Sequence, residues 1–403
     1  MRRGLCRIPP FCTAALAGGS ALLLLACYGS QDVRRLPTLD GRPPIVVAHR
    51  GASGYLPEET LEAYARAMDL GADVVEMDLI ATKDGALICR HDPNLVFSTD
   101  VASHPEFAAR RKTTQVDGET QTGWFASDFT LAEIKTLGAI STDAERPQPY
   151  NGQFRLVTFQ EVIDLVKARI AATGRRIGVY PETKNPTYHR DLGLPLEDTL
   201  IAQIQAAGWN SRSAPIYVQS FEPGSLRYLR ARGLATKLIQ LIDADNVDLR
   251  TGALTFALPY DRPYDWARAG DPRLFSAMVT PAGLAEIRTY ADGIGPWKRY
   301  IVTVKGTLDA NGNVLDLNGD GLINEADATC QTPTTLIADA HWAGLLVHPY
   351  TFRNEQRRLA RDYRGDPKQE YLAFYTLGVD GVFTDFTDTA VAARETFLQA
   401  WEP

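Results

Sequence analysis

The sequence has few cysteines, no cluster of basic residues and no apolar run that would comfortably span a bilayer. With 5 cysteines in 403 residues, the chain is not a disulfide-dense scaffold. Because no Lys/Arg-rich run exists and the net charge is −7, no nucleic-acid partner is expected. A small molecule that bears phosphate remains compatible, since a few placed cations suffice to bind it. No internal repeat is visible, and the length allows either two or three domains or one large α/β barrel.

The first 27 residues are typical of a secretory signal and not of the fold. Met1-Arg2-Arg3 is basic, and the apolar segment 14–26 is too short for a comfortable span. The segment ends in Leu24-Leu25-Ala26-Cys27, which resembles a bacterial lipoprotein box. We therefore expect a periplasmic or cell-envelope lipoprotein held on a membrane by a lipid on Cys27, with ordinary cleavage nearby as the alternative. Residues 28–43 are polar, contain proline and are predicted to form a tether.

Once a signal ending at Cys27 is removed, Cys89 and Cys330 are the other two cysteines of the chain. Cys89 lies in an apolar, strand-like run, where a buried free thiol is common. The sequence favours free thiols and leaves a Cys89–Cys330 bridge as the alternative.

From residue 44 to residue 400, short apolar runs alternate with amphipathic helical patterns. The predicted strands are 45–50, 73–79, 177–182, 215–220, 237–242, 291–295, 344–348 and 380–385. The predicted helices are 59–70, 158–169, 195–207, 223–232, 281–290, 334–342 and 367–377. Eight strands that alternate with helices favour a parallel sheet, most simply an α/β fold of the closed (β/α)8 TIM barrel type.

Three segments interrupt this alternation. Residues 93–157 and 298–333 are long insertions, and each follows a predicted strand, so we expect both on the catalytic face of the barrel. Thr82-Lys83-Asp84-Gly85 is a turn signal, and the strand should return after it. Folding the chain between Asp84 and Gly85 pairs residues whose numbers sum to about 169, which places His91 roughly opposite Asp78.

Three acidic residues end predicted barrel strands. Glu76 and Asp78 lie on one face of a strand because side chains alternate, and Glu182 ends the run 177–182. Carboxylates this close repel one another unless a cation lies between them. Three oxygen ligands with open positions favour Ca²⁺ or Mg²⁺ over Zn²⁺. The alternative, ordinary salt bridges at strand ends, is weakened by the two histidines described next.

Two histidines and two cations follow the same strand ends. His49 and Arg50 close the first strand, His91 follows the strand return, and Lys184 lies two residues after Glu182. Arg50 and Lys184 are suited to hold a phosphate, the first by its planar fork and the second as a point charge. Two histidines on either side of a phosphodiester serve as general base and general acid. A single histidine at a strand end would more often be a structural hydrogen-bonding group.

A set of short motifs follows in order along the chain: His49-Arg50-Gly51, Leu56-Pro57-Glu58-Glu59-Thr60, Glu76-Met77-Asp78, Thr82-Lys83-Asp84-Gly85, His91-Asp92, Thr122-Gly123-Trp124-Phe125, Pro181-Glu182-Thr183-Lys184, Val218-Gln219-Ser220-Phe221, Ala291-Asp292-Gly293-Ile294-Gly295-Pro296, Val347-His348-Pro349-Tyr350-Thr351 and Gly381-Val382-Phe383-Thr384-Asp385-Phe386. In this order, the motifs resemble the glycerophosphodiester phosphodiesterase family, and most closely its longer, periplasmic bacterial type. The resemblance covers most of residues 45–390. One departure is Glu59, where the family usually has Asn.

The resemblance implies a metal-dependent hydrolase that splits glycerophosphodiesters into glycerol 3-phosphate and an alcohol. By the same resemblance, the metal ligands are Glu76, Asp78 and Glu182, the acid/base pair is His49 and His91, and Arg50 and Lys184 bind the phosphate. His49 is the expected base and His91 the expected acid. Phe221 and Trp297 are expected to flank the glycerol or the leaving group, with core or rim packing as the alternative. Two other functions stay open: a phospholipase or wall-polymer phosphodiesterase, and a non-catalytic lipid- or polymer-binding lipoprotein.

A second cation site is predicted in the second insertion. Residues 316–327 have the spacing of an EF-hand-type calcium loop, with a glycine at its sixth position and Asp rather than Glu at its twelfth. The expected ligands of a structural Ca²⁺ are Asp316, Asn318, Asp320, Leu322 and Asp327. The loop resembles those of dockerins, and an exiting helix is expected after Glu325. We expect the ion to brace a long loop at the catalytic face.

Overall fold

A computed structural model describes residues 35–401, and its main sheet has the eight parallel strands expected of the barrel. In spatial order they run β14-β11-β8-β7-β6-β2-β1-β15. The strands are β1 (Ile45–Ala48), β2 (Val74–Ala81), β6 (Gly178–Thr183), β7 (Tyr217–Ser220), β8 (Lys237–Ile242), β11 (Gly293–Pro296), β14 (Leu346–Val347) and β15 (Gly381–Thr384). The predicted signal peptide 1–27, Cys27 and the start of the tether lie outside the described residues.

Backbone hydrogen bonds join the two ends of this sheet. The Asp380 N–H donates to the Val347 carbonyl over 2.9 Å, the Phe383 N–H to the Pro349 carbonyl over 3.0 Å, and the Phe352 N–H to the Phe383 carbonyl over 2.8 Å. The chain after β14 therefore lies beside β15 and closes the sheet. Together with the helices described next, this is the predicted (β/α)8 barrel.

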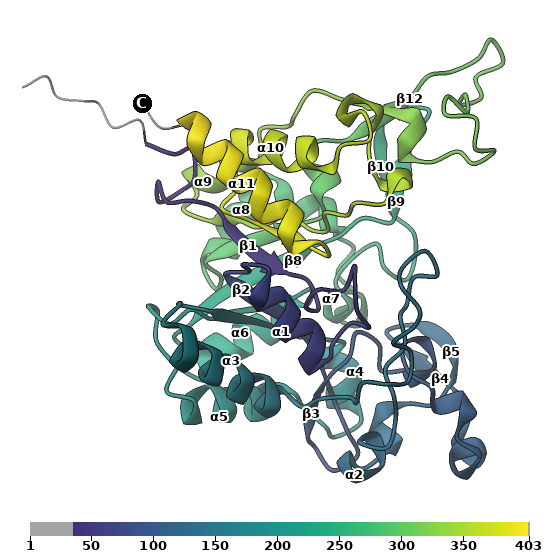
Figure 1. Cartoon of the computed structure of the whole chain (residues 1–403), viewed down its shortest axis with the longest axis vertical. Helices are drawn as coiled ribbons and strands as arrows, with labels where there is room; N and C mark the ends of the chain where they lie inside the picture. Colours follow the sequence, from purple (N-terminus) through teal and green to yellow (C-terminus); the bar gives the residue numbers. More distant parts are fainter. Residues whose placement is uncertain (1–34, 402–403) are drawn as a thin grey trace, which may run out of the picture. The chain divides into compact units, whose positions relative to one another are not determined.

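Helices follow the barrel strands and cover the outside of the sheet (Figure 1). They are α1 (Leu61–Asp69), α3 (Phe159–Thr173), α5 (Glu197–Ala206), α6 (Pro223–Ala231), α8 (Pro281–Arg288), α9 (Leu336–Trp342), α10 (Pro367–Leu377) and α11 (Thr387–Trp401). Their ends follow from local chemistry. Thr158 and Glu161 form a capping box at the start of α3, and Gly174 ends it with a φ of 68°. Within residues 35–401, no helix is both long and apolar enough to cross a membrane.

The strand return after β2 is a three-residue loop, not a two-residue one. Thr82 N–H donates to the Ala86 carbonyl across Lys83–Gly85, and Gly85 takes a φ of 77°. Consequently β3 (Leu87–Cys89) pairs with β2 so that Leu79 faces Cys89. The next residue, Arg90, donates its N–H to the Asp78 carbonyl. The prediction that His91 lies opposite Asp78 was therefore wrong by one residue, because the extra loop residue shifts the register.

The two insertions form lobes that both project toward the right edge of Figure 1. The first contains the hairpin β4 (Lys112–Val116) and β5 (Glu119–Gly123) and the short helix α2 (Leu131–Ile134), and its apolar cluster also includes Ile80 of β2 and Ile88 of β3. The second contains the antiparallel pair β12 (Val304–Gly306) and β13 (Ala328–Cys330). The helix expected after Glu325 is wrong: one 3₁₀ turn, Glu325–Asp327, leads directly into β13.

Smaller elements complete the loops at this end of the barrel. Helix α4 (Pro186–Asp191) follows β6, and the connection after β8 carries the pair β9 (Asn246–Asp248) and β10 (Ala253–Thr255) and helix α7 (Tyr264–Ala269).

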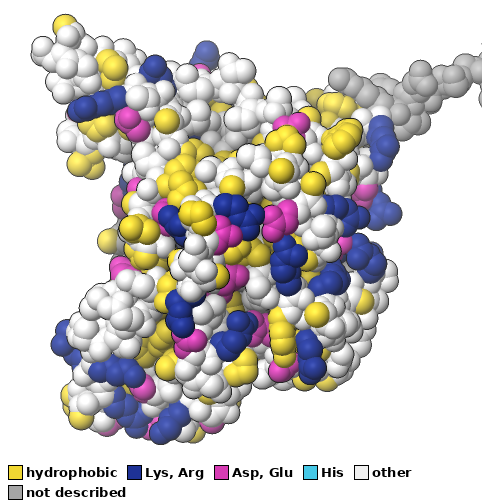
Figure 2. Space-filling view, turned by 180° about the vertical axis from the view of Figure 1, so that it is seen from behind, with side chains coloured by type: hydrophobic (Ala, Val, Ile, Leu, Met, Phe, Trp, Pro, Cys, Tyr) yellow, Lys and Arg dark blue, Asp and Glu magenta, His cyan; other side chains and the backbone are white. Residues whose placement is uncertain are grey.

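Cys89 is buried, Cys330 is half-buried, and both thiols are free. On the face shown in Figure 2, Lys and Arg side chains are interspersed with acidic and apolar ones.

Candidate active site

A cavity of about 520 Å³ opens where the barrel strands end. Its lining includes eight residues that the sequence predicts as functional: His49, Arg50, Glu76, His91, Glu182, Lys184, Phe221 and Trp297. Asp78 is buried at its floor. The first insertion contributes Val116, Asp117 and Gln121 to the wall, and the second contributes Glu325. Both insertions thus shape the catalytic mouth, as the sequence predicted.

The acidic floor of the cavity consists of Glu76, Asp78 and Glu182, here called the carboxylate triad. Parallel pairing of β2 with β6 sets Asp78 beside Glu182, and Glu76 lies two residues earlier on the same face. One carboxylate oxygen of each residue lies within 4.8 Å of those of the other two. Burial raises the pKa of Glu182 to about 8, and burial followed by the charge of Asp78 raises that of Glu76.

The triad has the features of a divalent-cation site. One oxygen from each of three buried carboxylates lies close to the other two, and burial with mutual repulsion disfavours the ionised forms of Glu76 and Glu182. Asp78 Oδ2 is buried and has no hydrogen-bond partner among the described residues. A hard cation such as Ca²⁺ or Mg²⁺ would accept these oxygens as ligands and remove the repulsion. The residues present therefore fit the metal that the sequence predicts.

Two cations border the triad. Lys184 Nζ lies 3.0 Å from Glu182 Oε1 and 3.9 Å from Asp78 Oδ1. Arg50 Nε lies 2.9 Å from Asp78 Oδ2, in an ion pair that lacks the angles of a hydrogen bond. Although burial opposes it, Lys184 and Arg50 lower the pKa of Asp78. Arg50 has a φ of 58°, a conformation that costs energy for a residue with a side chain and that occurs often at functional sites.

His49 is buried at the end of β1, and Asp385 contacts its ring on the Nδ1 side. Its Nδ1 lies 2.6 Å from Asp385 Oδ1, so a proton on Nδ1 would leave Nε2 as the acceptor. Arg353 Nε donates to the other oxygen of Asp385 over 2.8 Å, and Arg146 also donates to it. Burial, and then the charge of Arg50, lower the pKa of His49. His49 is therefore expected to be neutral near pH 7.

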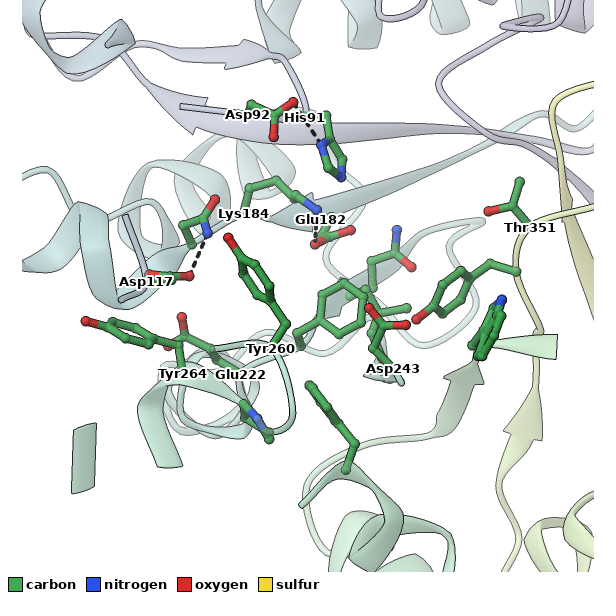
Figure 3. A pocket seen from close by; sticks show the side chains of 18 of the residues that line it. His91, Asp92, Asp117, Glu182, Lys184, Glu222, Asp243, Tyr260, Tyr264 and Thr351 are labelled. Atoms are coloured by element: carbon green, nitrogen blue, oxygen red, sulfur yellow. Dashed lines mark hydrogen bonds and ion pairs between the residues drawn. The ribbon is translucent and has the colours of Figure 1, made fainter. Parts of the chain in front are cut away.

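His91 is the more accessible histidine. Its side chain is 34 % exposed, and its Nδ1 lies 3.1 Å from Asp92 Oδ2. Figure 3 shows His91 and Asp92 near Lys184 and Glu182. The two histidines therefore reach one cavity from different strands, each paired with an acid.

Asp385 and Arg146 were absent from the predicted site. Asp385 directly follows the last barrel strand, β15. His49 and Glu182 were identified because they lie at the ends of apolar runs, so the same rule would have identified Asp385. Arg146 comes from the first insertion and makes a further contact with Glu355 over 2.9 Å. No spacing in the sequence relates Arg146 to a residue 239 positions later. Its contact depends on the three-dimensional course of the insertion.

Glu58 and Glu59 have separate structural roles. Glu58 accepts from Arg50 Nη1 over 3.1 Å and from the Thr142 hydroxyl over 3.0 Å. Glu59 is fully buried, accepts from the Asp78 N–H over 2.8 Å and also accepts from the Tyr64 hydroxyl. The residue that departs from the family motif therefore supports the backbone of a triad member.

Aromatic side chains form another part of the cavity wall. Lys184 Nζ lies 5.6 Å from the centre of the Phe221 ring, which packs edge-on against Tyr350 and Phe275. Trp297 is partly buried and also lines the cavity. Both predicted aromatic residues are thus placed to contact a bound molecule beside the phosphate-binding cations.

The predicted calcium loop, residues 316–327, is here called the acidic loop. Asp316 accepts from the N–H groups of Gly319 and Gly321 over 2.7 and 2.9 Å. Asp327 is fully buried and accepts from the Leu317 N–H over 2.7 Å. Two other expected ligands also accept from the backbone of the loop. Asn318 Oδ1 accepts from the Asp320 N–H, and Asp320 Oδ1 accepts from the Leu322 N–H. The carboxylates of this loop are thus satisfied by its own backbone.

Comparison with known proteins agrees with this geometry. The model of the "Glycerophosphoryl diester phosphodiesterase family" matches residues 49–389. The chain belongs to this family. Glycerophosphodiester phosphodiesterase GDPD6 of Arabidopsis thaliana is 37 % identical over 387 residues, covering 91 % of this chain and 92 % of the relative. The glycerophosphodiester phosphodiesterase of Haemophilus influenzae is 30 % identical over 396 residues, covering 94 % and 97 %.

A solved structure supports the fold assignment. The structure of an Oleispira antarctica phosphodiesterase in complex with the product sn-glycerol-3-phosphate superposes with a TM-score of 0.52 at 18 % identity, covering 89 % of this chain and 99 % of that chain. At this identity the likeness shows a shared barrel. In this member of the family, the carboxylate triad, the two histidines and Lys184 all lie at the catalytic mouth of that barrel.

Proposed function

We propose that this enzyme hydrolyses glycerophosphodiesters to glycerol 3-phosphate and an alcohol, with a divalent cation bound by Glu76, Asp78 and Glu182. The observation that supports it best is the convergence of three buried carboxylates beside Arg50 and Lys184, in one cavity with His49 and His91. Membership of the family supports the substrate class.

The proposed step moves two protons at two nitrogen atoms. His49 Nε2 takes one proton of the attacking water, whose oxygen forms the new bond to phosphorus. The bond between phosphorus and the alcohol oxygen breaks, and His91 gives a proton to the leaving oxygen. Arg50 and Lys184 hold the phosphate oxygens by charge. A bound divalent cation would stabilise the negative charge that develops there.

The difference between the histidines supports the direction of proton transfer. The pKa of His49 is lowered by burial and by Arg50, so its neutral, proton-accepting form predominates near pH 7. Asp385 also fixes its orientation through Nδ1. His91 lies at the more open side of the cavity, where a leaving alcohol has a path to solvent. We therefore assign His49 as the base and His91 as the acid.

The direct test is the release of glycerol 3-phosphate from glycerophosphocholine by purified protein. Activity should be lost after chelation and return when Ca²⁺ or Mg²⁺ is added. Absence of glycerol 3-phosphate with every glycerophosphodiester tried, in the presence of each metal, would contradict the proposal. We favour Ca²⁺ because carboxylate ligands suit its larger, flexible coordination shell, and the two metals are compared in the same assay.

We also propose that the acidic loop binds a second, structural Ca²⁺. The support is the spacing of Asp316, Asn318 and Asp320, with Asp327 at the twelfth position. Glu325, directly before its end, pairs with the buried Arg299 over 2.7 Å and lines the catalytic cavity. An ion in the loop would therefore brace this wall.

Finally, we propose export and lipid anchoring through Cys27, supported by the sequence of residues 1–27. In a bacterial host, the full chain should fractionate with membranes. The Cys27→Ser variant, once its signal is cleaved at an ordinary site nearby, should appear in the soluble fraction. Equal membrane association of both proteins would contradict a lipid anchor at this residue.

A further inference from the structure

The tip of the β4–β5 hairpin places a buried acid in the catalytic cavity. Asp117 and Gly118 form the two-residue turn, with φ values of 48° and 86°, as in the type I′ turns that favour Asp-Gly and Asn-Gly. Residues of such a tip normally face solvent, and Gly118 and Glu119 do so. Asp117 is only 8 % exposed and lines the cavity that contains Lys184.

One oxygen of this carboxylate lacks a partner. Asn185 Nδ2 donates to Asp117 Oδ2 over 2.6 Å. Asp117 Oδ1 is buried and accepts no hydrogen bond from any described residue. A buried acceptor left unpaired costs free energy, and a charged one costs more. The turn itself does not explain the acid, because Asn serves equally well in this type of turn.

No lysine or arginine of the described chain forms an ion pair with Asp117. Lys184 is the nearest candidate along the wall, but its ammonium group is 3.0 Å from Glu182. Arg268 pairs instead with Asp191. Burial accordingly raises the pKa of Asp117 to about 6. The carboxylate therefore lies in the substrate cavity without a cation of its own.

The surroundings of Asp117 suit a small cation. Glu222 lines the same end of the cavity, and both of its oxygens accept hydrogen bonds from Thr187. Tyr260 and Tyr264 cover this end (Figure 3), and the Tyr260 hydroxyl donates to Glu119 over 2.6 Å. Aromatic faces attract cations. One acid with an unpaired carboxylate oxygen and two tyrosines thus border a space that a cation would fill.

This end of the cavity is adjacent to the phosphate-binding end. Asn185, which holds Asp117, directly follows Lys184 in the chain. A diester whose phosphate lies at Lys184 can therefore extend its alcohol toward Asp117. The first insertion, which brings Asp117 here, would then select the alcohol, while the barrel residues act on the phosphate.

We propose that Asp117 binds the positively charged amino group of the substrate's alcohol, so that the enzyme prefers glycerophosphodiesters of amino alcohols. This inference rests on the proposed hydrolysis of glycerophosphodiesters. A primary ammonium can donate a hydrogen bond to Asp117 Oδ1, whereas a quaternary ammonium offers charge alone. The expected order of kcat/KM is glycerophosphoethanolamine, then glycerophosphocholine, then glycerophosphoglycerol, whose alcohol carries no positive charge.

The test compares these three substrates with the wild-type protein and with Asp117→Asn. Asparagine keeps the turn and the shape of the side chain but removes the charge. In the variant, kcat/KM for glycerophosphoethanolamine should fall about tenfold, mainly through KM, while the value for glycerophosphoglycerol stays within about twofold. Asp245→Asn is the matched control, because Asp245 is an exposed acid of the same cavity that accepts from Thr255. Its substrate order should match that of the wild type.

The outcomes separate this inference from the proposed function. If the wild type hydrolyses all three substrates and Asp117→Asn lowers every kcat/KM equally, the inference is overturned and the proposed function stands. A wild type whose kcat/KM for glycerophosphoglycerol equals its values for the two amino-alcohol diesters also overturns it. If no glycerophosphodiester is hydrolysed by wild type, both are overturned.

Discussion

The carboxylate triad and the acidic loop are both clusters of acids at the catalytic end of the barrel, but their oxygens face different partners. In the triad, carboxylates face one another within 4.8 Å, and burial raises the pKa values of Glu76 and Glu182. In the loop, Asp316 and Asp327 face backbone N–H groups of the loop itself. A bound cation would relieve the repulsion among the triad carboxylates, whereas Asp316 and Asp327 of the loop already accept hydrogen bonds from N–H groups. The triad is therefore the stronger candidate for an essential ion.

The largest expected effect comes from Glu182→Gln. Losing one charged ligand should lower kcat/KM by about a hundredfold or more, because a metal ion stabilises the transition state by several kcal/mol. The melting temperature should change by less than about 4 °C, since the amide keeps the side-chain volume and removes a repelling buried charge. Thermal melts measure the change in melting temperature, and initial rates measure the change in kcat/KM.

Glu197→Gln is the matched control for that variant. Glu197 is also buried, but it pairs with Arg190 over 2.8 Å away from the site. Its rate should remain close to that of the wild type. If Glu182→Gln and Glu197→Gln lower the rate equally, the triad is an ordinary structural cluster.

A second effect should come from Asp385→Asn, about a hundredfold in kcat. Asp385 raises the pKa of His49 through its charge and its hydrogen bond. Its removal should therefore shift the acidic limb of the pH–rate profile to lower pH, since His49 then loses its proton at a lower pH. A rate loss without a shift of this limb would indicate a structural defect only.

The smallest effect should come from the acidic loop. Adding millimolar Ca²⁺ should raise the melting temperature by about 2–6 °C if the loop binds with the affinity of extracellular calcium sites. In the Glu182→Gln background, where the triad has lost a ligand, Asp316→Asn should abolish the calcium-dependent shift that remains, and alone it should leave kcat within about twofold. Asp309→Asn is the control, because Asp309 caps its own turn outside the loop. A shift of the same size in Glu182→Gln with and without Asp316→Asn would place the second ion elsewhere.

The barrel, and the gathering of most candidate site residues in one cavity, were predictable because strand period and strand ends are local properties of the sequence. His49 follows β1, Glu76 and Asp78 lie on one face of β2, and Glu182 lies near the end of β6. Neighbouring parallel strands bring such positions together at one end of a barrel. The one-residue error at His91 arose because one turn signal is compatible with a two- or a three-residue loop. Local residue chemistry predicts the order of strands and turns, but it does not determine the pairing register between β2 and β3.

Residues contributed by the first insertion were not predictable. Arg146 and Asp117 reach the site through loops whose course depends on packing with distant segments, such as Asp385 for the first and Asn185 for the second. The exiting helix expected after Glu325 failed for a similar reason. Pairing of β13 with β12 and the ion pair between Glu325 and Arg299 fix that segment as a strand.

The central claim is that an ion held by the triad is essential for the reaction. The most direct measurement is the rate of glycerol 3-phosphate release from glycerophosphocholine by protein stripped of metal, with residual metal quantified by mass spectrometry, as Ca²⁺ or Mg²⁺ is titrated back. If the ion is essential, the stripped protein has no measurable rate and recovers fully at saturating metal, with little recovery in Glu182→Gln. A full rate in protein shown to contain no metal would contradict it.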